Sequence, residues 1–252
     1  MGCGNHETVV EPYTVYLVSD SICKTYTESE APLKGWGQYI NLCFEEAGIK
    51  VDNLAEGGRS TKSFRNDGRW AENDSCNGVP GVMATLTAGD YVLFSLGHND
   101  RVTSDANRGT TIDEYKENLK NYVTDTRSKG ATPVFVTPPT ERWTESTNSL
   151  LERSDAMKAV AEEMDVTVLD LNLESWKHFE EVGFEASQNK YYCTKDQIAA
   201  VNPTYLESHP NGDLTHFNET GAKYLAKTIA QLLKSSSETL GVWANPEAIT
   251  LD

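Results

Sequence analysis

Short apolar runs alternate along the chain with segments whose apolar residues recur at helical spacing. Runs that suit buried strands occupy residues 15–18, 51–55, 91–96, 132–137 and 166–171. Segments of helical periodicity occupy about residues 33–47, 149–164 and 219–233, and a further one begins at Thr111. Strands that alternate with helices in this way predict a parallel sheet covered by helices on both faces.

Local signals mark where several of these elements begin and end. Gly48 follows the first helical segment and predicts its end, because glycine readily takes the left-handed conformation found there. Thr111 and Glu114 have the spacing of a capping box, which predicts the start of a helix. Pro138 follows the fourth apolar run and predicts its end, since proline cannot donate to a strand ladder.

The predicted elements form one domain. The 252 residues suffice for a single well-buried α/β domain, and the chain has no internal repeat or linker. We expect a tail over residues 1–12, the domain over residues 13–235 and a C-terminal extension over residues 236–252. Residues 173–212 break the alternation, and we expect either a surface insertion or part of a substrate rim there.

The charge of the chain restricts its partners. The formal net charge is -16, from 38 acidic and 22 basic residues. Because so acidic a surface repels phosphate backbones and anionic lipid, we expect neither nucleic acid nor a membrane face as a partner. No apolar run in the sequence approaches the length that crosses a bilayer, so no transmembrane segment is expected.

The five cysteines are scattered and form no CxxC pair, so we expect no zinc site and at most a bridge or two. The start Met1-Gly2-Cys3-Gly4-Asn5 is similar to the trimmed N-terminus of a mature bacterial lipoprotein, with Cys3 as the lipid-bearing residue. In that interpretation the protein is secreted, periplasmic or lipid-anchored at the cell surface. The alternative is a cytoplasmic start or a remnant of cloning.

Unusual polar residues gather in four places along the predicted sheet. They are Ser19-Asp20-Ser21 after the first strand, residues 53–60 after the second, Gly97-His98-Asn99-Asp100 after the third and Asp213-Leu214-Thr215-His216 before the last helix. In an open parallel sheet, ligands bind beyond the carboxyl ends of the strands. These four blocks are therefore candidates for one shared site.

The blocks contain the residue types that acyl transfer requires. A serine nucleophile such as Ser21 needs an adjacent base, and a histidine such as His216 is the usual one. Asp213, three residues before His216, can reach the ring across a single turn and fix its tautomer. The tetrahedral intermediate carries an oxyanion, for which the backbone N–H groups of Ser21 and Gly58 and the Asn99 amide are suitable donors.

These residues also carry a family resemblance. Ser21, Gly58, Asn99 and His216 occur in the order of the SGNH, or GDSL, hydrolases. The sequences Gly58-Arg59-Ser60, Gly97-His98-Asn99-Asp100 and Asp213-Leu214-Thr215-His216-Phe217 are most similar to the rhamnogalacturonan acetylesterase branch. The resemblance spans about residues 13–235. Ser19 stands where the family has a glycine, which weakens the first block without removing a catalytic group.

The resemblance implies a fold and a function. The expected fold is a three-layer α/β/α sandwich around a parallel, five-stranded, flavodoxin-like sheet. The expected activity removes acetyl groups from a pectic, rhamnogalacturonan-type polysaccharide or oligosaccharide through an acyl-serine intermediate, with no cofactor and no metal. The alternatives are an SGNH esterase, lipase or thioesterase for another acyl substrate, or a non-catalytic sugar-binding protein with this fold.

Each block also has a structural interpretation when it is taken alone. Ser21 suits a helix N-cap, Gly58 a tight turn, and Asn99 a turn pair with Asp100. Four blocks in this order at one edge of a sheet favour an active site over four separate coincidences.

Further residues are candidates for substrate binding. Asp20 and His98 lie inside the blocks, although His98 equally suits packing. Trp70, Trp143 and Trp176 suit either stacking on sugar rings or the core.

A basic stripe follows the Gly58 block. Its members are Arg59, Lys62, Arg65 and Arg69. The stripe either contacts the carboxylates of galacturonate, with Arg59 held inside the site, or is a solvated face balanced by Glu56 and Asp67.

Overall fold

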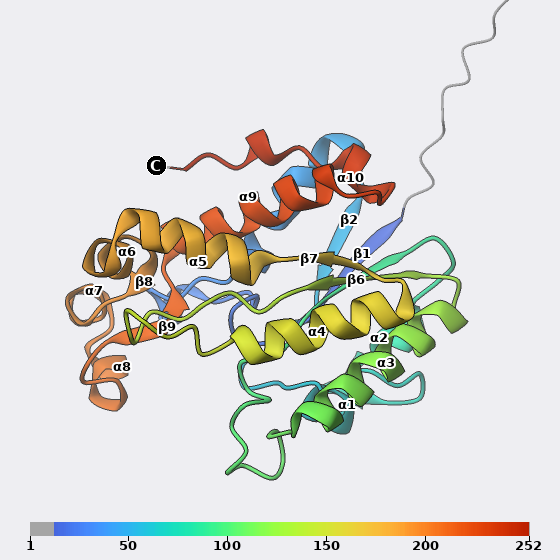
Figure 1. Cartoon of the computed structure of the whole chain (residues 1–252), viewed down its shortest axis with the longest axis horizontal. Helices are drawn as coiled ribbons and strands as arrows, with labels where there is room; N and C mark the ends of the chain where they lie inside the picture. The colour runs from blue at the N-terminus through green and yellow to red at the C-terminus, as the bar shows by residue number, and fades with distance from the viewer. Residues whose placement is uncertain (1–12, 252) are drawn as a thin grey trace, which may run out of the picture.

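A five-stranded parallel sheet forms the centre of the molecule (Figure 1). The structure is a computed structural model, and it describes residues 13–251. In the order β2-β1-β5-β6-β7, the sheet contains β2 (Lys50–Asn53), β1 (Thr14–Ser19), β5 (Tyr91–Ser95), β6 (Thr132–Val136) and β7 (Thr167–Leu169). This order is flavodoxin-like, with its switch point between β1 and β5. The predicted sheet is confirmed.

The side chains of β1 show why the sheet needs a layer on each face. Val15 and Leu17 are buried in one apolar cluster, while Tyr16 and Val18 are buried in another. Successive residues of a strand point to opposite faces, so a strand that is apolar throughout must be covered on both sides. The predicted three-layer sandwich is confirmed.

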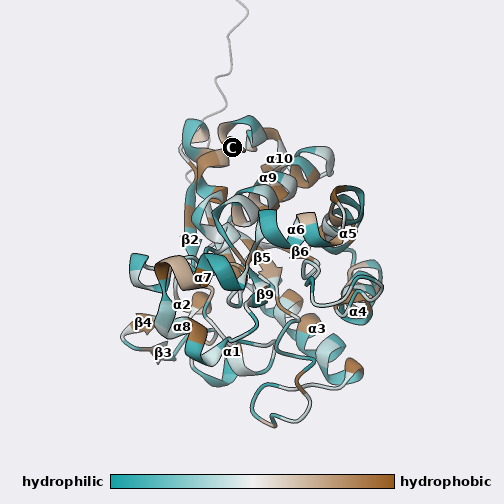
Figure 2. Ribbon diagram, turned by 90° about the vertical axis from the view of Figure 1, so that its left-hand side faces the viewer, coloured by the Kyte–Doolittle hydropathy of each residue, from teal (hydrophilic) through white to brown (hydrophobic). Residues whose placement is uncertain are grey.

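Helices with both hydrophilic and hydrophobic residues supply the two outer layers (Figures 1 and 2). One face is covered by η2 (Trp36–Gln38), η3 (Ile40–Ala47), α5 (Leu171–Val182), α9 (Glu219–Ser235) and α10 (Leu240–Trp243). The other face is covered by α1 (Ser63–Asn66), α2 (Val82–Thr85), α3 (Ile112–Ser128) and α4 (Leu151–Met164). The remaining short elements are η1 (Glu28–Glu30), β3 (Ser75–Cys76), β4 (Val79–Pro80) and η4 (Pro246–Ala248).

The local signals in the sequence locate the helix ends well. The Thr111 side chain accepts a hydrogen bond from the Glu114 backbone N–H at 3.2 Å, and the Glu114 carboxylate accepts one from the Thr111 N–H at 2.7 Å. Gly48 ends η3 in the left-handed conformation, with φ of 68°. The segment before Gly48 differs from the expected α-helix, because it forms two successive 3₁₀ helices.

Residues 173–212 fold into helices and one short strand at one end of the sheet (Figure 1). After α5 come α6 (Phe184–Tyr191), β8 (Tyr192–Cys193), α7 (Lys195–Val201) and α8 (Pro203–Ser208). The strand β8 pairs antiparallel with β9 (Asp213–Phe217). The expectation of a single turn between Asp213 and His216 is therefore corrected, because pairing with β8 holds this block in an irregular strand.

The C-terminal extension packs on the same core as α9. Leu240 and Ile249 are buried in that cluster, and the Asn245 N–H donates to the Cys43 carbonyl at 2.9 Å.

The four cysteines within residues 13–251 are all free, whereas Cys3 and the predicted tail lie outside the described residues. None of the helices described is both long and apolar enough to cross a membrane.

Candidate active site

Ser21 lies in the turn that follows β1, at the switch point of the sheet. The preceding Ser19 is fully buried, and its hydroxyl donates to the Ser95 carbonyl of β5 at 2.5 Å. Asp20 is also fully buried, and its Oδ1 accepts from the Ile22 N–H at 3.0 Å. Buried polar groups need such partners, so these bonds fix the turn and the direction of Ser21.

The His216 imidazole joins Ser21 to Asp213. Its Nε2 lies 2.7 Å from Ser21 Oγ, and its Nδ1 lies 2.6 Å from Asp213 Oδ2. Asp213 Oδ1 accepts the backbone N–H groups of Thr215 and His216, at 3.1 and 3.0 Å, which holds the carboxylate under the ring. The three residues predicted to be catalytic are thus brought into one hydrogen-bonded chain from segments 195 positions apart.

The two ionisable members of this chain shift each other's pKa. Burial raises the pKa of Asp213, but the hydrogen bond and charge of His216 and the Tyr205 hydroxyl outweigh it and hold this pKa far below its usual range. Burial lowers the pKa of His216, but the hydrogen bond and charge of Asp213 raise it above the ordinary 6.5. Asp213 therefore remains a carboxylate and favours a protonated His216, as a base that must accept a proton from serine requires.

Gly58 and Asn99 lie next to each other on the loops after β2 and β5. Gly58 has φ of 75°, a left-handed conformation that L side chains rarely adopt. Asn99 Nδ2 donates to the Arg59 carbonyl at 3.0 Å, so the Asn99 amide is attached to the residue after Gly58. The loops that carry the two predicted oxyanion donors are therefore linked through the Arg59 carbonyl.

Arg108 was not identified from the sequence; it contacts Asn99 and lies near Gly58. Its Nη1 donates to Asn99 Oδ1 at 3.1 Å, and its Nε lies 2.8 Å from Asp105 Oδ2. A Cβ added to Gly58 would lie 3.7 Å from the same Nη1. The residue stands in a loop without periodicity, nine positions after Asn99, so no local pattern marks it.

The buried Asp100 carboxylate connects the Asn99 loop to the loop that follows Gly58. Its carboxylate accepts from the Thr61 N–H at 3.1 Å, from the Thr61 hydroxyl at 2.5 Å and from the Thr110 hydroxyl at 3.1 Å. Burial raises the pKa of Asp100 to about 6, although these hydrogen bonds lower it. Asp100 thus sets the spacing of the Gly58 and Asn99 loops.

Two residues expected to contact substrate are buried beneath the site. Asp20 is fully buried and His98 is 5% exposed. His98 Nδ1 lies 3.5 Å from Asp20 Oδ2, and His98 Nε2 lies 3.1 Å from the Pro139 carbonyl. The structure therefore places both side chains where they support the Ser21 turn, away from the surface.

The basic stripe is paired within the protein. Arg59 Nε lies 2.7 Å from Asp67 Oδ2, and Arg69 Nη2 lies 3.7 Å from Glu56 Oε2, the two acidic partners named by the solvated-face interpretation. Arg65 Nη2 lies 2.7 Å from Asp125 Oδ2, and Lys62 Nζ donates to the Ala106 carbonyl at 2.7 Å. A role of these cations in substrate binding stays a prediction.

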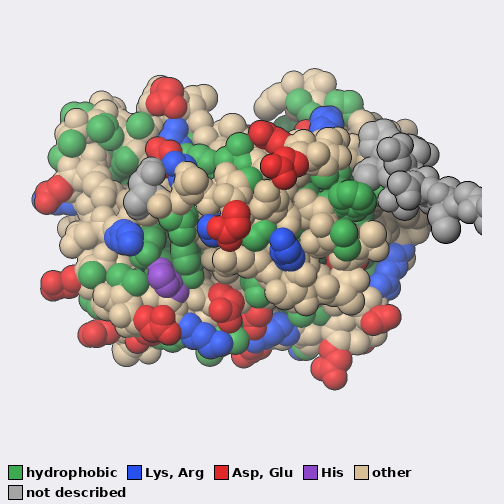
Figure 3. Space-filling model, turned by 90° about the horizontal axis from the view of Figure 1, so that it is seen from above, with side chains coloured by type: hydrophobic (Ala, Val, Ile, Leu, Met, Phe, Trp, Pro, Cys, Tyr) green, Lys and Arg blue, Asp and Glu red, His purple; other side chains and the backbone are tan. Residues whose placement is uncertain are grey.

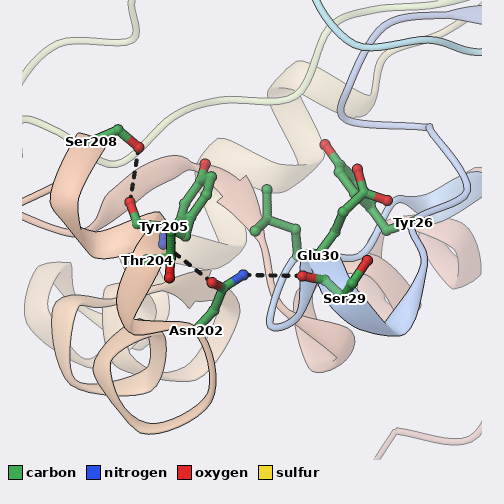
Figure 4. Close-up of a pocket in the computed structure, with 8 residues that line it drawn as sticks. Tyr26, Ser29, Glu30, Asn202, Thr204, Tyr205 and Ser208 are labelled. Atoms are coloured by element: carbon green, nitrogen blue, oxygen red, sulfur yellow. Dashed lines mark hydrogen bonds between the residues drawn. The ribbon is translucent and has the colours of Figure 1, made fainter.

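Two tyrosines that line a neighbouring cavity, Tyr26 and Tyr205, bond to the triad (Figure 4 shows the cavity). The Tyr205 hydroxyl donates to Asp213 Oδ2 at 2.6 Å, and the Tyr26 hydroxyl donates to the Ser21 carbonyl at 3.0 Å. Both rings line a cavity of about 430 Å³. Tyr205 was not identified from the sequence; it lies within residues 173–212, which were expected to be a surface insertion or part of a substrate rim.

The three candidate tryptophans have different environments. Trp70 is core, 2% exposed and packed edge-on against Tyr122. Trp176 is half-buried with the Arg142 guanidinium over its ring. Trp143 is 46% exposed. Of the three, only Trp143 presents a large open face.

Within residues 13–251, no group of three or more His, Cys, Asp or Glu residues is arranged to hold a metal ion.

Comparisons with known proteins agree with this geometry. Residues 20–224 match the GDSL-like Lipase/Acylhydrolase family. The chain is 34% identical over 227 residues to "Rhamnogalacturonan acetylesterase RhgT" of Bacillus subtilis, covering 88% of this chain and 89% of that protein. It is 32% identical over 224 residues to "Probable rhamnogalacturonan acetylesterase YesY" of the same organism, covering 87% and 92%.

Solved structures show the same fold. The protein YxiM of Bacillus subtilis superposes with a TM-score of 0.70 at 25% identity, over 90% of this chain and 57% of that one. Axe2, an acetylxylan esterase from Geobacillus stearothermophilus, superposes with a TM-score of 0.61 at 18% identity, over 92% and 96%.

Proposed function

The chain belongs to the GDSL-like lipase/acylhydrolase family of serine esterases, and from that premise we propose that it removes acetyl groups from a pectic polysaccharide of the rhamnogalacturonan type. The observation that carries the proposal is the 2.7 Å separation of Ser21 Oγ and His216 Nε2, with Asp213 on the other ring nitrogen. The relatives named as rhamnogalacturonan acetylesterases support the substrate class, since they align with most of the chain.

In the first step Ser21 Oγ attacks the carbonyl carbon of the acetyl ester while His216 Nε2 accepts the serine proton. The carbonyl oxygen becomes an oxyanion, for which the N–H groups of Ser21 and Gly58 and the Asn99 Nδ2 are the donors. His216 then gives its proton to the sugar oxygen as the C–O bond to the acetyl carbon breaks. The sugar leaves as a free hydroxyl, and acetyl-Ser21 remains.

In the second step water replaces the sugar hydroxyl. His216 accepts a proton from water as the water oxygen attacks the acetyl carbon, and the same donors hold the new oxyanion. Collapse returns the proton from His216 to Ser21 Oγ and releases acetic acid, which loses its remaining proton to solvent and becomes acetate. The negative charge of Asp213 stabilises the imidazolium in both steps.

The test is acetate release from acetylated rhamnogalacturonan, with acetylated xylan and a small aryl acetate as comparison substrates. The wild type should release acetate fastest from rhamnogalacturonan. Ser21→Ala should abolish turnover on all three substrates while circular dichroism and the unfolding midpoint stay unchanged, because only one hydroxyl is removed. More than trace activity in a folded Ser21→Ala protein would contradict the assignment of the nucleophile.

A location outside the cytoplasm fits a polymeric substrate, and we propose that Cys3 bears a lipid anchor. Cys3 lies outside the described residues, so this proposal rests on the sequence resemblance alone. Mass spectrometry of the N-terminal peptide from the native source would detect the lipid. An unmodified Cys3 in that peptide would contradict the anchor.

A further inference from the structure

A second cavity lies beside the catalytic histidine. It measures about 340 Å³, within the range of small-molecule sites, and it is lined by Arg101, Glu141, Trp143, Thr144, Thr147 and Ser149. The Thr215 hydroxyl donates to Glu141 Oε1 at 2.9 Å, and Thr215 directly precedes His216. Arg101 comes two residues after Asn99. The cavity therefore adjoins both the proposed base and the proposed oxyanion donor.

Trp143 forms an apolar wall of this cavity. Its side chain is 46% exposed, yet its indole N–H donates to the Thr215 hydroxyl at 2.7 Å. Thr215 is in turn held by Glu141. A large exposed ring that is fixed by a chain of hydrogen bonds loses little entropy when a ligand covers it. Its flat face suits the apolar face of a sugar ring.

The two charged residues of the cavity, Arg101 and Glu141, form a pair of unequal exposure. Glu141 is 4% exposed and forms an ion pair with Arg101, while its other oxygen accepts from the Ser149 hydroxyl at 2.8 Å. The Arg101 side chain is 33% exposed, and its Nε donates to the His98 carbonyl at 3.2 Å. Arg101 Nη1 forms no hydrogen bond to any residue that the structure describes. Arg101 is thus the more exposed member of the pair, and its guanidinium is held in place in a chain whose net charge is -16.

We infer that this cavity is a subsite for a uronic acid residue of the substrate, with the sugar ring on Trp143 and the carboxylate on Arg101. Guanidinium matches the planar geometry of a carboxylate, and pairing there offsets the repulsion between an acidic protein and an acidic polymer. Arg101 suits this role better than Arg65 and Arg69 because it lines the cavity, whereas they do not. The inference rests on the proposed function, because it assigns part of that substrate to a place.

Binding to the inactive Ser21→Ala protein tests the subsite without turnover. The probes are deacetylated rhamnogalacturonan oligosaccharides and, as neutral ligands, xylo-oligosaccharides of equal length, measured by isothermal titration calorimetry. Adding Trp143→Ala should weaken the binding of the rhamnogalacturonan probe about tenfold, since it removes one stacked ring. Adding Arg101→Gln should weaken it about fivefold and reduce its dependence on salt, as expected for a partly exposed ion pair.

Matched variants separate these effects from misfolding. Trp143→Phe keeps an aromatic face and should retain most of the affinity, and Arg101→Lys keeps the charge and should retain part of it. Arg127→Gln is the control for a lost cation, since Arg127 is exposed and donates to the Met164 and Asp165 carbonyls at 2.8 and 2.7 Å. It should bind the probes like the parent protein.

Each contrary outcome overturns a defined part of the inference. Unchanged affinity in Trp143→Ala would remove the stacking platform. Equal binding of xylo-oligosaccharides, or no effect of Arg101→Gln, would remove the uronic acid specificity. Acetate release by the wild type from xylan in preference to rhamnogalacturonan would instead overturn the proposed substrate, and it is measured separately from the binding of the oligosaccharides.

Discussion

Arg108 Nη1 donates to Asn99 Oδ1 at 3.1 Å, and this bond decides which way the Asn99 amide faces. With Oδ1 held by a cation, Nδ2 turns toward the Arg59 carbonyl and the Gly58 loop. A flipped amide would present a carbonyl oxygen to the developing oxyanion and repel it. We therefore expect Arg108 to be a positioning residue, which acts on the reaction through Asn99.

Arg108→Ala should lower kcat on a small aryl acetate about tenfold and leave KM nearly unchanged, because the amide loses its orienting partner and serves mainly the transition state. Asn99→Ala should cost about a hundred- to a thousandfold in kcat. Steady-state kinetics of both single variants and of the double variant measure this. Additive losses in the double variant, or a change confined to KM, would contradict a role through Asn99.

The pH dependence of kcat/KM should report His216. The imidazole must be neutral to accept the Ser21 proton, and its pKa is raised above 6.5 by Asp213. Activity should therefore be full at pH values above this raised pKa and should fall as the pH drops through it. In Asp213→Asn the carboxylate charge is lost, so this fall on the acidic side of the pH profile (the acidic limb) should move to lower pH while kcat falls. A limb that stays in place in Asp213→Asn would assign it to another group.

Tyr205→Phe should move the acidic limb of the pH profile to higher pH. The Tyr205 hydroxyl donates to Asp213 Oδ2, the oxygen that also faces His216 Nδ1. Without this hydroxyl the carboxylate charge is less stabilised and attracts the imidazole proton more strongly, so the His216 pKa should rise. The pH profile of the variant on an aryl acetate measures the shift. A limb that moves to lower pH, or does not move, would contradict this effect of the Tyr205 hydroxyl on the Asp213 charge.

Gly58→Ala should strain the oxyanion loop. The residue has φ of 75°, and the only atom within 4 Å of an added Cβ in the described structure is Arg108 Nη1. The cost is therefore conformational, and about 1–2 kcal/mol of unfolding free energy should be lost. Urea unfolding measures this loss. Gly57→Ala is the matched control, since an added Cβ at that neighbouring residue meets nothing within 4 Å and its φ lies outside the left-handed range. Equal losses in both variants would contradict the explanation.

The sequence by itself determined the order of the elements and the members of the triad. Apolar runs and caps are local signals, so the strand at Tyr91–Ser95 and the start of α3 at Thr111 follow from neighbouring residues. Ser21 and Asn99 follow the adjacent strands β1 and β5, and parallel strands end at one edge of a sheet. Their convergence is thus a property of the topology, which the alternation of elements already specifies.

Only the tertiary structure decided which polar residues serve that site. Arg101 forms an ion pair with Glu141, 40 positions later in the sequence, and Arg65 forms one with Asp125, 60 positions later. The exposure of Trp143 and the burial of Trp70 likewise depend on what packs against each ring. Even the Asp213 block became a strand through its pairing with β8. Side-chain partners and burial are set by distances between segments far apart in the chain, and no periodicity or spacing in the sequence encodes those distances.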